Sequence, residues 1–329
     1  MFTVAFPHPP ASGGPGSFQK RFEAELKNRG YKIIYAYDTD KADIVFVVGG
    51  TKKLIWLLKN KFNKIPIIYR LDGINWIHRK RKIVPLPFIK SEIQNIICKI
   101  IHKFLSSYIV YQSIFVKEWW KSAGWRKSKN YEIINNGIDI EEFRPYFNDV
   151  KTKPHLICLE GYVDYTPYAI DLINFLSQKL EIKFEVYGDI KFKEQREKLK
   201  TDVNYIGRVA FNDLPKTYQN TIYLSLDINA GCPNTVIEAL ACGSPVVGFD
   251  TGSLKELVPE GSGIIVPYGG DPWKLETPNY QGLADAIAKI AENYEYYSIN
   301  ARKTAEEKYN INMIVDKYIS VIQKAIHNK

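Results

Sequence analysis

The segment of the chain that is richest in chemical information runs from residue 229 to residue 250, NAGCPNTVIEALACGSPVVGFD. The pattern predicts a loop, a short helix opened by Pro233, a tight turn and a buried strand. Glu238 is the one charge in that apolar helix, and a buried carboxylate is costly unless it is paired or meets a ligand. The helix also starts with backbone N–H groups near Asn234 and Thr235, which suit an anion. The segment therefore predicts a nucleotide site.

A glycine-rich loop after the first expected strand is a second candidate site. Gly13 and Gly14 would let the backbone approach a phosphate closely, and the helix expected from about Ser17 adds a positive dipole. Simple turn glycines remain the alternative. The spacing differs from G-x-G-x-x-G, so the dinucleotide fingerprint of a dehydrogenase is absent.

Apolar runs predict the elements that position these residues. Continuous runs of this kind are typical of strands in parallel sheets buried on both faces. In the first half they cover residues 2–6, 33–37, 44–48, 65–71, 108–111 and 132–134. In the second half they cover residues 156–159, 184–187, 205–206, 223–226, 246–249 and 264–266. A polar stretch at 146–154 predicts a linker between two α/β halves, with ligands at the carboxyl ends of the strands.

The segment at 229–250 resembles the donor-site signature of retaining glycosyltransferase family 4. Members carry E-G-(F or C)-P-x-x-x-x-E-A-x-A-x-G-x-P-V-(V or I), which is matched here by Gly231, Cys232, Pro233, Glu238, Ala239, Ala241, Gly243, Pro245, Val246 and Val247. A second match, INNGIDIEEFRP at residues 134–145, resembles the segment I-x-N-G-(V or I)-D-x-x-x-F-x-P between the family's domains. The two matches fall in the family's order and separation, and the resemblance covers essentially the whole chain.

The resemblance implies an α/β protein of two Rossmann-like domains that face each other across a cleft, the GT-B fold. Residues 1–147 would form the acceptor-side domain, and residues 148–310 the domain that binds the nucleotide-sugar donor. The final helix, residues 311–329, would cross back to the first domain and act as part of the hinge.

The resemblance also assigns roles to residues. Glu238 would accept hydrogen bonds from the ribose hydroxyls, with an ion pair to a nearby Lys or Arg as the alternative. The helix start would hold the diphosphate or the sugar, and the glycine loop would face the donor. The predicted donor-binding residues are Gly13, Gly14, Asp227, Asn229, Gly231, Pro233, Asn234, Thr235 and Glu238.

Two departures from the family concern the donor site. Ala230 stands where the family has a glutamate that contacts the donor sugar. Asp227 or Asn229 is expected to replace it, because an alternating strand from Tyr223 would point both side chains the same way. Otherwise the sugar is held differently or turnover is weak. The family's Arg and Lys after the first strand of the second domain are also missing, and Arg208 is the nearest alternative cation or else an exposed loop charge.

Asp72 and Arg208 are the predicted catalytic residues. The end of the fourth strand corresponds roughly to where the family places a His or a His-Asp pair near the reaction centre, with Leu71 in the position of the histidine and Asp72 after it. Asp72 would contact the acceptor, or else cap an Asx turn.

The resemblance therefore implies a retaining enzyme that moves a sugar from a nucleotide-sugar donor to a glycan or lipid-linked acceptor. Front-face transfer would be assisted by stabilisation of the leaving group. No cofactor and no divalent metal are expected, since the sequence has no Asp-x-Asp triplet. The rival interpretation is a non-catalytic or weakly active relative that binds a nucleotide or glycan.

Composition constrains the partners. The 329 residues favour two domains, and the formal net charge is +9. The densest basic run, HRKRK at residues 78–82, lacks any nucleic-acid-binding motif, so peripheral attraction to an anionic bilayer is favoured over nucleic acid. A helix at 85–104 is expected to pack on the sheet rather than lie on a membrane. With scattered cysteines and no signal peptide, the expected location is the cytoplasm, including the membrane surface.

Overall fold

The computed structural model describes residues 1–11, 13–80, 85–124, 130–146 and 153–327. These residues form two compact units, one made of Met1–Gly137 with Ile311–Lys329 and the other of Ile138–Asn310. Most of the linker predicted at residues 146–154 and part of the basic run at 78–82 lie outside the described residues.

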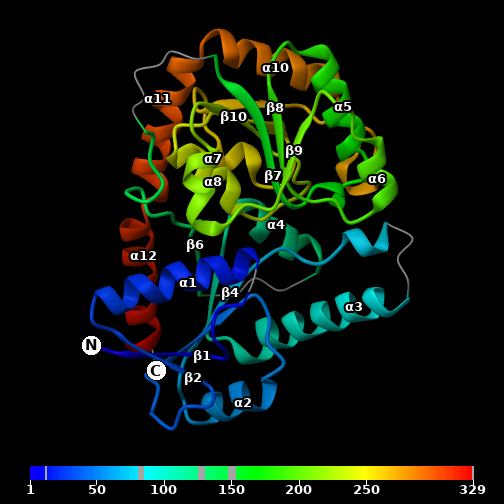
Figure 1. Cartoon of the computed structure of the whole chain (residues 1–329). Helices are drawn as coiled ribbons and strands as arrows, with labels where there is room; N and C mark the ends of the chain where they lie inside the picture. Colours follow the sequence, from blue (N-terminus) through cyan, green and yellow to red (C-terminus); the bar gives the residue numbers. More distant parts are fainter. Residues whose placement is uncertain (12, 81–84, 125–129, 147–152, 328–329) are drawn as a thin grey trace. The chain divides into compact units, whose positions relative to one another are not determined.

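The first unit is built on a parallel sheet with strand order β2-β1-β3-β4-β5-β6 (Figure 1). Its strands are β1 Thr3–Phe6, β2 Lys32–Tyr35, β3 Ile44–Val48, β4 Ile67–Leu71, β5 Tyr108–Tyr111 and β6 Tyr131–Ile133. Its helices are α1 Gly14–Asn28, α2 Leu54–Phe62, α3 Pro85–Ile100, α4 Ile114–Ser122 and α12 Ile311–His327, with a short π-helical turn, η2, at Ile101–Leu105 and a 3-10 turn, η1, at Ile77–Arg79.

Helices cover both faces of this sheet. On one face α1 packs beside α12, and the ring centroids of Phe22 and Tyr318 lie 5.0 Å apart over the buried side chains of β1 and β3. The opposite face is covered from α2, η2 and α4, where Leu57, Ile101 and Trp120 are buried. The central strands β1, β3, β4 and β5 are buried on both sides and are therefore mostly apolar rather than alternating, whereas the edge strands β2 and β6 are partly exposed.

The second unit repeats this architecture with strand order β12-β11-β10-β7-β8-β9. Its strands are β7 His155–Tyr162, β8 Phe184–Asp189, β9 Asn204–Gly207, β10 Thr221–Leu224, β11 Val246–Phe249 and β12 Gly263–Val266. Its helices are α5 Ala169–Lys179, α6 Lys193–Lys198, α7 Leu214–Thr217, α8 Asn234–Ala241, α9 Leu254–Leu257, α10 Tyr280–Glu292 and α11 Tyr294–Thr304, followed by η6 Ala305–Tyr309. Short 3-10 turns lie at η3 Val163–Tyr165, η4 Phe211–Asp213 and η5 Pro272–Lys274.

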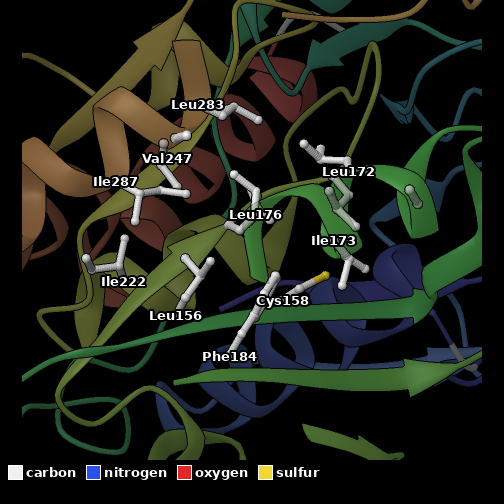
Figure 2. Close-up of a cluster of buried hydrophobic side chains, with 14 of the residues drawn as sticks. Leu156, Cys158, Leu172, Ile173, Leu176, Phe184, Ile222, Val247, Leu283 and Ile287 are labelled. Atoms are coloured by element: carbon white, nitrogen blue, oxygen red, sulfur yellow. The ribbon is translucent and has the colours of Figure 1, made fainter. Parts of the chain in front are cut away.

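The core of the second unit lies on both faces of its sheet. Figure 2 shows one side, where Leu172 and Leu176 of α5 and Ile287 of α10 gather over the strand residues Leu156 and Val247. On the other side α8, α9 and α11 bury a second apolar cluster. The sheet edge formed by the carboxyl ends of β7 and β10 is thereby held rigidly from both faces.

The structural division of the chain falls at Gly137, not at the predicted boundary of 147. The physical reason is that Ile138 and Phe143 are fully buried in the second unit. Arg302 of α11 reinforces this by donating from Nη1 to the carbonyl oxygens of Ile140 and Phe143, at 3.0 and 2.8 Å. The segment at 134–145 therefore ends the first unit and begins the second.

The predicted α/β fold of two Rossmann-like sheets is confirmed, with three local corrections. α1 begins at Gly14, earlier than the expected residue 17, because proline fits the first turn of a helix. β10 ends at Leu224, two residues before its expected end at 226. The expectation that the helix at 85–104 packs on the sheet is wrong for its first half, whose apolar side chains are exposed.

Candidate functional site

The start of α8 lies at the carboxyl edge of the second unit's sheet. Pro233 is its N-cap residue, and the proline side chain makes no capping hydrogen bond. One turn inside, Thr235 Oγ1 accepts a hydrogen bond from the hydroxyl of Tyr223, a fully buried residue of β10, at 2.8 Å. This helix start is thus anchored to the sheet, in an orientation that suits an anion.

Glu238 is buried in α8, with 4% of its surface exposed. Its Oε2 accepts a hydrogen bond from the Tyr218 hydroxyl at 3.3 Å. Burial and the nearby Glu238 carboxylate raise the pKa of Tyr218 well above its ordinary value, so the phenol remains a donor. Part of the desolvation cost of Glu238 is therefore met inside the protein, and its contact with ribose stays a prediction.

The loop between β10 and α8 does not continue the strand's alternation. Asn229 has a left-handed backbone, with φ of 54°, and its N–H donates to Thr251 Oγ1 at 3.2 Å. The inference that Asp227 and Asn229 point the same way because of an alternating strand is therefore wrong. The backbone of Ala230 is fixed by a hydrogen bond, because its carbonyl oxygen accepts from the Ser253 N–H at 3.0 Å.

Asp227 instead shares a cavity with Glu160, a residue that follows the buried part of β7. The cavity, of about 160 Å³, is lined by Glu160, Gly161, Tyr162, Val163, Tyr165, Thr166, Leu226 and Asp227, and we call it the acid-pair pocket. Glu160 Oε1 accepts from the Leu226 N–H at 3.2 Å, which ties the ends of the two strands together. The sequence reasoning assigned no role to Glu160. The available signal was an acidic side chain at the carboxyl end of an apolar strand.

Arg208, the proposed substitute cation, follows the edge strand β9 and is exposed. Its Nε and Nη2 lie 2.7 and 2.5 Å from one carboxylate oxygen of Asp189, at the end of β8. Its charge is therefore already engaged by Asp189, and a role in catalysis stays a prediction that requires an exchange of partners.

Asp72 lies in a cavity of about 260 Å³ in the first unit, at the carboxyl ends of β3 and β4. Arg70 Nη1 is 2.9 Å from Asp72 Oδ1, and Gln112 donates to the same oxygen. Arg70 itself is buried, donates from Nη2 to Asn136, and lies 3.8 Å from the ring centre of Phe18. Burial raises the pKa of Asp72, whereas Arg70 and Gln112 lower it. Asp72 is thus a member of a buried network rather than a simple turn cap.

The glycine loop of the first unit presents an open backbone. Gly13 has φ of 89°, and a Cβ added to Gly13 or Gly14 would meet no heavy atom within 4 Å. In contrast, a Cβ at Gly16 would lie 1.7 Å from the carbonyl oxygen of Ala11, so that glycine is required by packing. Gly13 and Gly14 are therefore accessible from outside, as a phosphate-contacting loop needs.

Metal ligands are not grouped in the part of the chain that the structure describes: no set of three or more His, Cys, Asp or Glu side chains there could hold an ion. All four cysteines are free thiols.

The fold places the chain in a known class of proteins. Its structure matches that of the Anabaena protein HepE in complex with UDP and glucose, with a TM-score of 0.72 and 16% identity over 98% of this chain and 100% of that one. It matches the sucrose-phosphate synthase of Thermosynechococcus elongatus with a TM-score of 0.73 and 14% identity over the whole of both chains. At such low identity these matches establish the fold alone, which is the two-unit α/β architecture of GT-B proteins.

Sequence comparisons then show which family the chain resembles. Residues 161–293 match the model of the family described as glycosyl transferases group 1. The chain is 23% identical over 306 residues to the N,N'-diacetylbacillosaminyl-diphospho-undecaprenol alpha-1,3-N-acetylgalactosaminyltransferase of Campylobacter jejuni, covering 83% of this chain and 74% of that protein. It is 25% identical over 162 residues to the GtfA subunit of the UDP-N-acetylglucosamine–peptide N-acetylglucosaminyltransferase of Streptococcus parasanguinis, covering 47% of this chain.

The chain spans only 30% of the length of the streptococcal relative. Residues 161–293, which the family model matches, include every residue that lines the acid-pair pocket except Glu160, and all of α8. The chain is thus a relative of the group 1 glycosyltransferases, and the predicted enzyme class is confirmed. The narrower assignment to retaining family 4 stays a prediction.

Proposed function

We propose that the protein is a retaining glycosyltransferase that moves a sugar from a nucleotide-sugar donor to a glycan or lipid-linked acceptor. The observation that carries this proposal is the start of α8, fixed at the carboxyl edge of the sheet by the bond between Tyr223 and Thr235. The backbone N–H groups and the positive end of the dipole at this helix start would bind the donor diphosphate. The acceptor would bind to the first unit, near Asp72.

In this proposal the leaving diphosphate is stabilised electrostatically, by the dipole of α8 and by Arg208 once it releases Asp189. The sugar would be transferred on the face from which the diphosphate leaves. No cofactor or divalent metal takes part in this scheme.

The test is a panel of nucleotide sugars, with hydrolysis of the donor measured alone and with glycan and lipid-linked acceptors. Release of nucleoside diphosphate with retained anomeric configuration supports the proposal. Ala230 favours a second candidate, a relative that binds a nucleotide but turns over little, because a methyl group cannot hydrogen-bond a sugar. Binding without turnover across the panel would favour that candidate.

Replacing Glu238 with glutamine is expected to weaken nucleoside diphosphate binding. Loss of charge-assisted hydrogen bonds to ribose should cost roughly 1.5–3 kcal/mol. Isothermal titration calorimetry measures the change, and Glu292→Gln at the exposed end of α10 is the matched control.

Tyr218→Phe separates a binding role from a structural one. It removes the internal hydrogen bond to Glu238 while leaving the carboxylate in place. If both variants lower stability and neither changes nucleotide affinity, Glu238 is a structural residue and its assignment to the donor site is wrong.

We further propose that the protein works in the cytoplasm, in peripheral contact with an anionic membrane, through an exposed apolar stripe on α3. Leu86, Ile89, Ile93 and Ile96 are 63%, 51%, 48% and 56% exposed, at the spacing of one helix face. Lys90 and Lys99 on the same helix are exposed beside it. Apolar side chains rimmed by lysines complement an anionic bilayer surface.

A second exposed apolar surface lies on α2 of the same unit. On α2, Ile55, Leu58 and Phe62 are exposed on one face, and Lys61 of that helix donates to the carbonyl of Phe104 in η2, just after α3. No helix in the described ranges is long and apolar enough to cross a membrane. Contact would therefore be made by side chains entering the bilayer surface.

The variant Ile89→Glu/Ile93→Glu is expected to lose binding to anionic vesicles by about tenfold or more, since each buried isoleucine contributes about 1.5–3 kcal/mol. Cosedimentation with phosphatidylglycerol and phosphatidylcholine vesicles measures this. The control is Ile299→Glu on α11, where the isoleucine is 61% exposed. Equal vesicle binding by both variants and the parent would exclude α3 as the contact.

A further inference from the structure

The acid-pair pocket has an unusual charge balance for a protein that is proposed to bind a diphosphate. Two carboxyl groups line it, and none of its described lining residues is Lys, Arg or His. Burial raises the pKa of both carboxyl groups, and the charge of Asp227 raises that of Glu160 further, against a hydrogen bond from the Leu226 N–H. Among the described residues, the other titratable groups that interact with the pair are Cys158, Tyr168, Tyr218 and Tyr223, none of them cationic. Both effects favour the protonated form of the carboxyl groups.

A third polar group in the pocket points to a ligand independently of the carboxyls. Thr166 is 4% exposed, and its Oγ1 has no hydrogen-bond partner among the described residues. A buried hydroxyl without a partner costs roughly 1–3 kcal/mol, so its retention needs a reason. A ligand group that both donates and accepts a hydrogen bond would satisfy it.

The size of the pocket restricts what can enter. Its volume of about 160 Å³ is below the roughly 300–1,000 Å³ typical of sites for drug-sized ligands. It has room for one ring-sized group and not for a whole nucleotide sugar. The half-exposed rings of Tyr162 and Tyr165 line its wall, which suits the apolar face of a sugar ring.

We propose that the acid-pair pocket binds the sugar ring of the donor through its hydroxyl groups, with Asp227, Glu160 and Thr166 replacing the carboxylate that is missing at Ala230. A protonated carboxyl donates, an ionised one accepts, and the threonine hydroxyl does both, as a set of sugar hydroxyls requires. A diphosphate is excluded by charge and lies instead at the start of α8. This inference rests on the proposed function.

The experiment compares each nucleotide sugar with its own nucleoside diphosphate by calorimetry. UDP-glucose, UDP-N-acetylglucosamine and GDP-mannose are measured against UDP and GDP. Asp227→Asn, Glu160→Gln and Thr166→Val should each weaken nucleotide-sugar binding by about tenfold or more. Binding of the nucleoside diphosphates should change by less than about twofold, because the variants leave α8 untouched.

Thr166→Val is the sharpest variant, since it removes a hydroxyl that has no partner in the protein. Thermal unfolding should show unchanged or slightly higher stability, while sugar-dependent affinity falls. Thr221→Val is the matched control. That hydroxyl donates to the Tyr218 carbonyl at 3.0 Å and lies 2.8 Å from Ser244 Oγ, so its loss should lower stability and leave the sugar contribution intact.

The outcomes distinguish failure of the pocket assignment from failure of the proposed function. Nucleoside diphosphate binding with a sugar contribution that no pocket variant changes overturns the pocket assignment and leaves the proposed function standing. Nucleotide-sugar binding that depends on Mg²⁺ in the parent but not in Asp227→Asn would show a cation in the pocket and also overturn it. Absence of any nucleotide or nucleotide-sugar binding by the parent overturns the proposed function and the inference together.

Discussion

Replacing Asp72 with alanine is expected to lower the free energy of unfolding by about 3–5 kcal/mol. The side chain of Arg70 is 1% exposed and lies 2.9 Å from the Asp72 carboxylate. A guanidinium group stays charged in proteins, so the variant leaves a buried positive charge without its counter-ion. Urea unfolding followed by tryptophan fluorescence measures the change. Loss of activity in this variant must therefore be separated from loss of folded protein.

The double variant Arg70→Met/Asp72→Ala identifies the cause. Replacing both members of a buried ion pair by uncharged groups is often close to neutral, so the double variant should be more stable than Asp72→Ala alone. Asp72→Asn keeps an oxygen facing Arg70 and Gln112, so its free energy of unfolding should lie between those of the parent and the alanine variant. If the double variant is less stable than Asp72→Ala, the unpaired charge of Arg70 is not the cause of the lost stability.

Gly252→Ala is expected to weaken nucleotide-sugar binding by about tenfold or more, because small displacements of a positioning loop have large effects on a site. The added Cβ would lie 2.6 Å from both the backbone nitrogen and the carbonyl oxygen of Ala230. The loop that carries Ala230 would have to move. The left-handed backbone, with φ of 61°, adds about 1–2 kcal/mol of strain. Calorimetry and thermal unfolding measure the two effects.

Gly124→Ala is the matched control for strain. Gly124 also has a left-handed backbone, with φ of 79°, but a Cβ there would meet nothing within 4 Å. Gly124→Ala should lose only the stability that the strained backbone conformation costs, and its donor binding should be unchanged. Similar donor affinities in the two variants would mean that the position of the Ala230 loop does not matter for binding.

The sheets were predictable because their central strands are buried on both faces and so leave apolar runs in the sequence, whereas the edge strands β2, β6 and β9 are partly exposed. β3, β5 and β11 coincide with the runs at 44–48, 108–111 and 246–249. The ends of α1 and β10 were less predictable. α1 starts earlier than expected because Pro15 fits its first turn. The left-handed Asn229 lies in a loop that begins before the apolar run of β10 ends.

The acid-pair pocket could not be predicted from the order of residues alone. Glu160 and Asp227 are far apart in the chain and meet because β10 lies beside β7, with Leu224 in register with Cys158.

The exposure of α3 could not be predicted from the sequence either. Its periodicity predicts an apolar face but not whether another element covers that face, and it is the end of α3, with Ile97, Cys98 and Ile100, and the following turn that reach the core.

The position of α12 determines the order in which the chain can complete its fold during synthesis. Ile138 pairs with Asn310 in a parallel bridge, and its N–H donates to the carbonyl of Tyr309 at 2.8 Å, so the second unit is a continuous insertion whose ends meet. All of its strands and helices leave the ribosome before the 17 residues of α12. Until that helix arrives, one face of the first sheet lacks Tyr318 and its apolar neighbours. The unit translated first is therefore the one that finishes folding last.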